Sequence, residues 1–399
     1  MDRGADGMMS PAVSPTPPSR ARTANVAGAV VLGCCAGWAL VSATGRTSRP
    51  EGVLLAVLAV AAGYACGRIA GSLLPVAAAA AAALGGLGLA LLSPGDGLSP
   101  GGGPPERMGP GTAELTLAAG AACCAAWAVR PGWRRSVLHL PAAGAAAAGC
   151  LLVGPAAAVP VVLVVLGSLA AGRVRRLPGL AALALIAAAA AGCCWALGAG
   201  ALPPGLLGAF QDHPPTHRIR LWHQAVRLAA AHPLRGVGPG RFGELTAGAA
   251  GPDGTAHSAL LQQAAEQGLP GVVLLGAVFG WLLYALWRSP RATPLVLAAG
   301  AALTALAVES MAGEALGSPR VTACAGLLAG LATARRADAG ETGVRVAATG
   351  VGLRPAGPRA PEADTAFRVV RPRKTPHPGL PEPGKPDDRD PDTGPGRAA

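Results

Sequence analysis

Aromatic and charged residues are scarce in this sequence. Of its 399 residues, 3% are aromatic and 14% are charged, whereas 51% are hydrophobic. Such a composition is typical of an integral membrane protein. The beginning of the chain also lacks a cleavable signal pattern, so we expect the first apolar run to remain as a membrane anchor. The sequence therefore predicts an all-α protein that crosses the membrane many times.

Metal-site and disulfide patterns are missing as well. All nine cysteines lie within apolar runs, and their spacing matches neither a zinc site nor a disulfide framework. The formal net charge of +12 is compatible with nucleic-acid binding, but the basic residues form short clusters between apolar runs, with few aromatic residues among them. Membrane orientation explains these clusters better, because Lys and Arg accumulate on the cytoplasmic side. We therefore expect no nucleic-acid partner and no metal.

Apolar runs of about 18 to 22 residues recur along the chain, which is the length a helix needs to cross a hydrocarbon layer of roughly 30 Å. They predict about ten transmembrane helices, seven within residues 25–201 and three within residues 269–336. Ala and Gly supply much of their apolar character, which allows close helix packing in lipid. The predicted spans are 25–44, 52–74, 75–93, 113–130, 137–153, 155–172, 180–201, 269–287, 293–311 and 321–334.

Three short basic loops give the orientation. They are residues 130–135, 173–176 and 288–291, and all three fall on the same side of the predicted spans. This side is expected to be cytoplasmic, so the long segment 202–268 faces outward. Residues 45–51, with Arg46 and Arg49, are a basic exception on the outer side.

The two ends of the chain differ from the apolar spans. Residues 1–24 are rich in Ser, Pro and Arg, and residues 337–399 in Pro, Gly, Arg and Asp. Such stretches cannot bury enough apolar surface to fold. We expect both to be disordered cytoplasmic tails.

The outward segment begins with an amphipathic helix, predicted over residues 217–231 with Thr216 as its N-cap. Trp222, Val226 and Ala229 share one face of this helix, and Arg220, Gln224 and Arg227 share another. We expect the helix to lie on the membrane, with its tryptophan near the headgroups.

A glycine-rich turn follows, with the sequence Gly236-Val-Gly-Pro-Gly240 and with Arg235 and Arg241 at its ends. Glycines at alternate positions permit backbone conformations that side chains forbid. Backbone N–H groups of Gly236, Gly238 and Gly240, together with the flanking guanidinium groups, are able to bind a phosphate. A turn that only packs at the bilayer surface is the alternative that the spacing leaves open.

A second helix is predicted over residues 256–267, with Thr255 as its cap and Gly268 as its stop. His257 then lies in the first turn, where the helix dipole favours the neutral imidazole that accepts a proton. Glu266 points away from His257 on this helix. A purely structural histidine at a helix start is the alternative.

Three motifs of this segment together resemble the O-antigen ligase and polymerase superfamily. They are Arg218-Ile-Arg-Leu-Trp222, His232-Pro-Leu-Arg-Gly-Val-Gly-Pro-Gly-Arg-Phe242 and His257-Ser-Ala-Leu-Leu-Gln-Gln-Ala-Ala-Glu-Gln-Gly268. Ser258 stands where the family more often has Asn, and Leu260 where an aromatic residue is common. The resemblance covers residues of about 205–290, and order, spacing and position between two spans all agree with it.

The resemblance implies a metal-independent glycosyltransferase without a cofactor, in the cytoplasmic membrane. Such enzymes move a glycan from an undecaprenyl diphosphate carrier to an acceptor hydroxyl at the outer face. By motif position His257 is the candidate base or acceptor-orienting residue. Arg218 is the first candidate for the diphosphate, with Arg220 and Arg241 as neighbours. Contacts with lipid headgroups are the alternative role for these arginines.

The resemblance leaves the acceptor open. Ligases and polymerases use the same donor, so a glycan, a lipid or a protein remains a candidate acceptor. A non-enzymatic transporter or scaffold for lipid-linked glycans is the competing hypothesis. Two features speak against a transporter: the middle of the predicted spans is nearly without charge, and the sequence shows no internal repeat.

Overall fold

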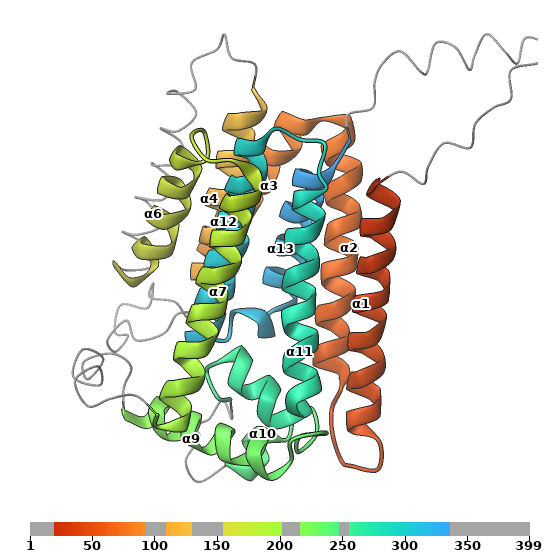
Figure 1. Cartoon of the computed structure of the whole chain (residues 1–399), viewed down its shortest axis with the longest axis vertical. Helices are drawn as coiled ribbons and strands as arrows, with labels where there is room; N and C mark the ends of the chain where they lie inside the picture. Colours follow the sequence, from red (N-terminus) through yellow and green to blue (C-terminus); the bar gives the residue numbers. More distant parts are fainter. Residues whose placement is uncertain (1–19, 93–108, 130–154, 202–215, 247–254, 336–399) are drawn as a thin grey trace, which may run out of the picture. The chain divides into compact units, whose positions relative to one another are not determined.

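The computed structural model describes residues 20–92, 109–129, 155–201, 216–246 and 255–335. Chain contacts divide the protein into Met1–Ala339 and Gly340–Ala399, and every described residue belongs to the first unit. All regular elements among these residues are helices, which confirms the all-α fold class (Figure 1). They are α1 (Arg20–Ala43), α2 (Glu51–Leu73), α3 (Pro75–Leu92), α4 (Pro110–Ala128), α6 (Pro155–Ala170), α7 (Arg176–Ala199), α9 (Thr216–Ala231), α10 (Phe242–Leu245), α11 (Ala259–Trp287), α12 (Thr293–Ala312), the 3₁₀ turn η1 (Ala315–Gly317) and α13 (Pro319–Thr333).

Within the described residues, six helices are long and apolar enough to cross a membrane, namely α1, α2, α3, α7, α11 and α12. Helices α4, α6 and α13 coincide in position with three further predicted spans. The predicted span 137–153 and both predicted tails lie outside the described residues, except for residues 20–24 of the first tail, which belong to α1. The total of about ten spans therefore stays a prediction.

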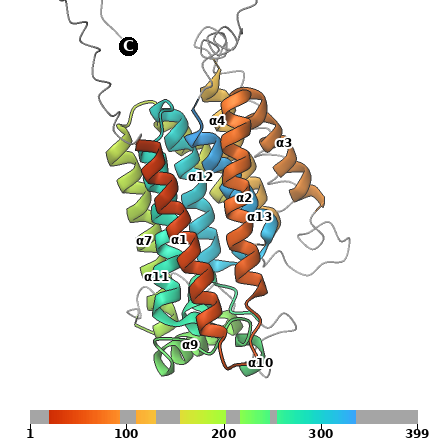
Figure 2. The ribbon, with the colours of Figure 1, turned by 90° about the vertical axis from the view of Figure 1, so that its right-hand side faces the viewer.

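The bundle exposes large apolar side chains on its outer helices and buries two helices inside. Leu58 of α2 is 65% exposed, and Leu84 of α3 and Leu185 of α7 are each 71% exposed. Water-soluble proteins rarely expose such surfaces, whereas lipid tails cover them. Helices α4 and α12 are buried along most of their length (Figure 2). The arrangement is that of a multi-pass membrane protein.

Helices α2 and α13 pack with backbone against backbone through glycines. A Cβ atom at Gly67 would lie 2.2 Å from the carbonyl oxygen of Leu327, and one at Gly330 would lie 2.3 Å from that of Tyr64. Contacts this short exclude any side chain at these two positions. Small residues thus set the distance between the helices, as expected from the composition.

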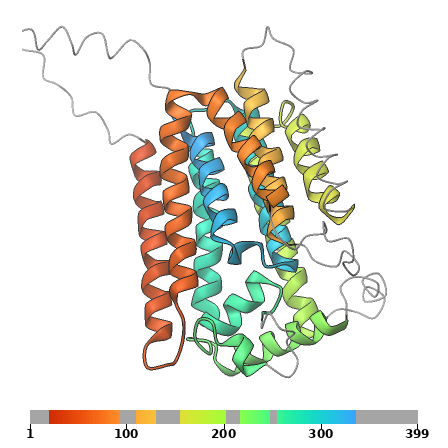
Figure 3. The same cartoon turned by 180° about the vertical axis from the view of Figure 1, so that it is seen from behind.

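Two of the three basic loops meet at one end of the bundle. Arg176 Nη1 donates to the carbonyl oxygen of Ser289 at 2.6 Å, and Nη2 donates to that of Arg291. This confirms that loops 173–176 and 288–291 share a side, whereas loop 130–135 lies outside the described residues. Helices α9 and α10 lie at the opposite end of α7 and α11, next to the loop between α1 and α2 (Figures 1 and 3).

Candidate functional site

Helix α9 forms where the sequence predicts it, but its tryptophan does not face the membrane surface. Trp222 is only 3% exposed, and its Nε1 donates to the carbonyl oxygen of Ala256 at 3.0 Å. The prediction of a tryptophan near the headgroups is therefore wrong, because this face of α9 closes a second hydrophobic core. That core consists of Cys194, Leu197, Leu221, Trp222, Ala225, Phe242, Ala256, Leu260, Leu261 and Ala265.

The glycine-rich turn packs directly on α11 at residues 265–267, just before the kink at Gly268. Gly236, Gly238 and Gly240 have φ angles of +59°, +106° and +73°, which side chains rarely allow. Their N–H groups donate to the carbonyl oxygens of His232 and Glu266 and, at 2.9 Å, to the Glu266 carboxylate. All three groups thus have acceptors within the protein. A phosphate would have to displace Glu266, so this arrangement gives no support to the predicted phosphate cradle.

The loop between α1 and α2 covers the other side of the same turn. Arg46 Nη1 donates to the carbonyl oxygen of Gly236 at 2.8 Å, and the N–H of Arg49 donates to that of Pro239 at 2.9 Å. The turn is therefore held between this loop and α11. The contact gives a structural reason for Arg46, which is the basic exception to the orientation pattern.

The sequence predicts His257 in the first turn of the second helix. This prediction is wrong, because His257 precedes α11. The N-cap is Ser258, whose hydroxyl accepts from the N–H of Leu261 at 3.5 Å, and α11 begins at Ala259. Serine is among the strongest N-cap residues, because its side-chain oxygen accepts a hydrogen bond from an N–H of the first turn. Thr255 is not the cap and donates its hydroxyl to Glu314. The argument from the helix dipole therefore no longer applies to His257.

The backbone of His257 has a left-handed conformation. Its φ of +50° is the only positive φ among the described residues other than glycine. Such a conformation costs free energy and occurs preferentially at functional sites. The backbone turns again at Gly268, where φ is +70° and α11 is kinked, so the predicted end of the shorter helix at Gly268 corresponds to this kink.

His257 is paired with a carboxylate that the sequence did not single out. Its Nδ1 lies 2.6 Å from Oε1 of Glu314, a residue of the short turn between α12 and η1. A carboxylate at Nδ1 fixes the tautomer that carries its proton there and leaves Nε2 as the proton acceptor. A single acid in a short turn carries no spacing signal, so only the folded chain identifies this pair.

Arg218 reaches the same turn from α9. Its side chain is buried, with 8% exposed, and Nη1 donates to the carbonyl oxygen of Ala312 at 3.3 Å. Residues 312 and 314 lie within about 7 Å of each other along the chain. Arg218 and His257 thus both contact the turn at residues 312–314, although they are 39 positions apart in the sequence.

The other two arginines of the prediction do not join this pair. Arg220 is exposed, and two residues of an α-helix correspond to a rotation of about 200°, so it lies on the opposite face of α9 from Arg218. Arg241 lies beside the glycine-rich turn, where its Nε is 3.5 Å from a carboxylate oxygen of Glu244. The candidate site therefore consists of Arg218, His257 and Glu314.

Two further carboxylates are buried in the bundle. Thr116 of α4 donates its hydroxyl to Glu309 of α12, and Glu114 is fully buried on α4. Glu309 lies three residues before the end of α12, and Glu114 four residues after the start of α4. Both are thus within about 6 Å of a helix end along the axis. The middle of these two helices is without charge, as the sequence indicates.

In comparisons with protein-family models and with curated proteins, the sequence has no match. The resemblance to the O-antigen ligase and polymerase superfamily therefore rests on the order and spacing of the three motifs. The geometry adds an independent observation, because residues from the first and third motifs meet at one turn.

Proposed function

We propose that the protein is a membrane glycosyltransferase of the O-antigen ligase type. It transfers a glycan from an undecaprenyl diphosphate carrier to an acceptor hydroxyl at the outer face of the cytoplasmic membrane, as a ligase or a polymerase. The observation that supports this proposal most is the meeting of Arg218 and His257 at residues 312–314. A base and a permanent cation, here each in contact with the same short turn, are the two groups that this transfer requires.

The reaction needs a proton acceptor for the incoming hydroxyl. The acceptor oxygen forms a bond to the anomeric carbon, the bond from that carbon to the diphosphate oxygen breaks, and the hydroxyl proton goes to His257 Nε2. Glu314 at Nδ1 orients the ring and stabilises the imidazolium that forms. The lipid diphosphate departs with the bonding electron pair.

The leaving diphosphate needs positive charge near the broken bond. A guanidinium stays charged at any physiological pH, and its planar fork of N–H donors matches the geometry of a phosphate group. Arg218 is therefore suited to hold a diphosphate oxygen without a metal. Its attachment to the turn that also holds Glu314 keeps this charge at a fixed position relative to His257.

A reconstituted assay with a lipid-diphosphate glycan tests these roles separately. We expect His257→Ala to lower the transfer rate by about 10²- to 10⁴-fold, the usual range for a lost general base, while donor binding changes little. Arg218→Ala should weaken donor binding as well as turnover. Arg218→Lys should restore only part of both, because an ammonium group lacks the two-pronged geometry of a guanidinium.

Arg235→Ala is the matched control, because Arg235 is an exposed residue at the same end of the bundle. All variants are first compared with the parent protein for membrane insertion and thermal unfolding. Near-normal transfer by His257→Ala would remove its catalytic role. A transporter or scaffold for lipid-linked glycans would then be the better description.

A further inference from the structure

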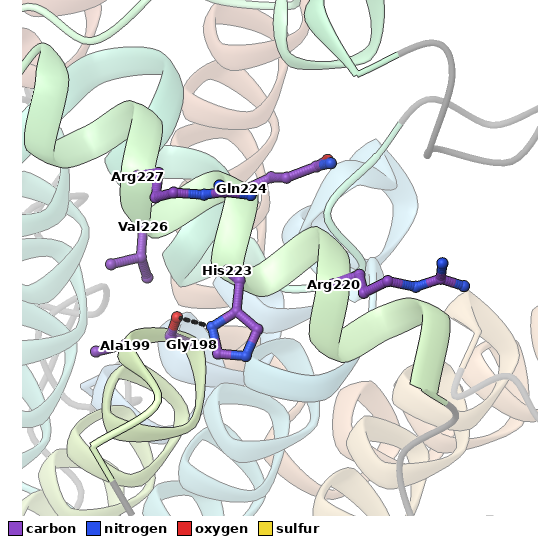
Figure 4. Close-up of a pocket in the computed structure, with 7 residues that line it drawn as sticks. All are labelled: Gly198, Ala199, Arg220, His223, Gln224, Val226 and Arg227. Atoms are coloured by element: carbon purple, nitrogen blue, oxygen red, sulfur yellow. Dashed lines mark hydrogen bonds between the residues drawn. The ribbon is translucent and has the colours of Figure 1, made fainter.

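A surface hollow lies where the end of α7 meets α9, on the face of α9 that points away from Arg218. Its volume is about 470 Å³. We call it the α7–α9 pocket, and its lining residues are Gly198, Ala199, Arg220, His223, Gln224, Val226 and Arg227 (Figure 4). Two arginines and a histidine are among its lining residues, and none of the described residues that line it is acidic, so it favours an anion.

Two features of α7 fix the floor of the pocket. His223 Nδ1 lies 2.8 Å from the carbonyl oxygen of Gly198, and Figure 4 shows its ring directed at that group. Gly200 ends α7 with a φ of +67°, and a Cβ atom there would lie 3.3 Å from the ring of His223. The histidine thus joins the two helices, and it leaves the anion to the neighbouring side chains.

Three side chains on one face of α9 have no partner that accounts for them. The guanidinium groups of Arg220 and Arg227 make no hydrogen bond or ion pair with another described residue. The side-chain oxygen of Gln224 is covered from solvent and also has no hydrogen-bond partner in the described part of the chain. A buried amide oxygen without a partner is costly, so a hydroxyl donor is the missing complement.

The spacing of these side chains suits a phosphate ester. Arg220, Gln224 and Arg227 follow each other at intervals of four and three residues, which places them in one row about 10 Å long. Long flexible side chains at both ends of such a row can converge on one phosphate group, while the amide between them contacts a neighbouring hydroxyl.

The level of the pocket relative to the bilayer indicates where the ligand comes from. Helix α7 has 24 residues and is therefore about 36 Å long, slightly more than a hydrocarbon layer of roughly 30 Å. Gly198 and Ala199 at its end accordingly lie at the depth of lipid headgroups when α7 crosses the membrane. Helix α9, about 10 Å thick, lies between this pocket and His257. A lipid-diphosphate glycan bound in the pocket would therefore be too far from the candidate base to react.

We propose that the α7–α9 pocket binds the headgroup of an anionic phospholipid that carries hydroxyl groups, with phosphatidylglycerol as the model. Arg220 and Arg227 hold the phosphate, and Gln224 accepts a hydrogen bond from a glycerol hydroxyl. The bound lipid fixes α9 at the membrane surface. This role goes beyond the proposed transfer reaction and uses neither Arg218 nor His257.

Binding of fluorescent lipids to the purified full-length protein tests the proposal. We expect phosphatidylglycerol to bind more tightly than phosphatidylcholine. Arg220→Gln combined with Arg227→Gln should weaken phosphatidylglycerol binding by about 25- to 100-fold, at about five- to tenfold for each charge. Gln224→Leu should reduce the preference for phosphatidylglycerol over phosphatidic acid, whose phosphate carries no hydroxylated group. The matched control is Arg235→Gln with Arg320→Gln, which removes the same charge from exposed residues outside the pocket.

Three results would overturn the proposal. The first is equal binding of phosphatidylglycerol and phosphatidylcholine, and the second is an equal loss of phosphatidylglycerol binding in the Arg235→Gln, Arg320→Gln control. The third is an Arg220→Gln, Arg227→Gln variant that loses binding of polyprenyl diphosphate and keeps that of phosphatidylglycerol. The last result would assign the pocket to the donor. His257→Ala serves as the opposite control, because it should leave lipid binding unchanged whatever it does to transfer. The lipid proposal and the transfer proposal therefore fail independently.

Discussion

The helical bundle and the outer segment, which comprises residues 216–246 and 255–268, both depend on glycine, but in different ways. In the bundle, Gly67 and Gly330 keep helical geometry and allow two backbones to touch. In the outer segment, Gly236 and Gly240 have positive φ angles and shape a turn that packs on α11. The bundle thus requires glycine at these positions because a Cβ atom would clash with the neighbouring backbone, whereas the turn requires glycine also for its backbone conformation.

The largest effect is expected from Gly236→Val. The first side-chain carbon at this position would lie 2.3 Å from the backbone carbon of Glu266, at a φ of +59° that valine strongly disfavours. Neither neighbour can move without opening the contact between the turn and α11. We expect detectable transfer to disappear and proteases to cut within the outer segment, while the bundle stays folded in detergent.

Gly276→Val is the control for this experiment, because a side chain at Gly276 of α11 would meet nothing within 4 Å. It should leave the protease pattern unchanged. Equal damage from both variants would show that α11, and not the turn, limits the stability of the segment.

The next largest effect is expected from Glu314→Gln. The amide keeps the size of the side chain but removes the charge that orients and stabilises His257. We expect transfer to fall by about 10²-fold or more, with unchanged donor binding. Glu314→Asp should recover part of the rate. A rate for Glu314→Gln within about twofold of the parent would remove Glu314 from the site, and Glu244→Gln serves as the control for loss of an exposed acid.

A smaller effect, confined to stability, is expected in the bundle. Gly67→Ala introduces a methyl group 2.2 Å from the carbonyl oxygen of Leu327, so α2 and α13 must separate. Overpacking of this kind typically costs about 1–3 kcal/mol, which a shift of the thermal unfolding midpoint would record. Gly85→Ala on α3 has open space and should cause no loss. Equal midpoints for both variants would contradict the close packing of α2 and α13.

Sequence patterns predict the bundle better than the site, for a physical reason. Apolar length and helical periodicity are local, so the positions of α7, α9 and α12 follow from short windows of sequence. Hydrogen-bond partners are not local. Glu266 accepts from Gly240, and Glu314 from His257 and Thr255.

Two further features, the cap of α11 and the environment of Trp222, depend on contacts between residues that are distant in the sequence. Thr255 and Ser258 are both able to cap a helix, and the bond of Thr255 to Glu314 leaves the cap to Ser258. Trp222 suits a membrane interface as well as a protein core. Its bond to Ala256 decides between them. The segment and its candidate base can therefore be predicted from the sequence, whereas the hydrogen-bond partners of these residues are seen only in the folded structure.

The smallest effect is expected from removal of divalent metal ions. The acidic residues of segment 202–268 are dispersed in the sequence, and the described ones have other partners: Glu244 lies beside Arg241, and Glu266 accepts from Gly240. A magnesium or manganese site needs several oxygen ligands at one point, so we assign the charge of the leaving diphosphate to Arg218. Transfer in excess chelator should stay within about twofold of the untreated rate. Removal of a catalytic metal ion would lower the rate far more than this, because a Lewis acid contributes several kcal/mol to stabilisation of the transition state. The assay is run beside Arg218→Ala, which reports how far transfer falls when the proposed cation is missing. Complete loss in chelator, with recovery on addition of Mg²⁺ or Mn²⁺, would transfer the role of Arg218 to a metal ion and leave His257 with Glu314 as the part of the proposal still to be tested.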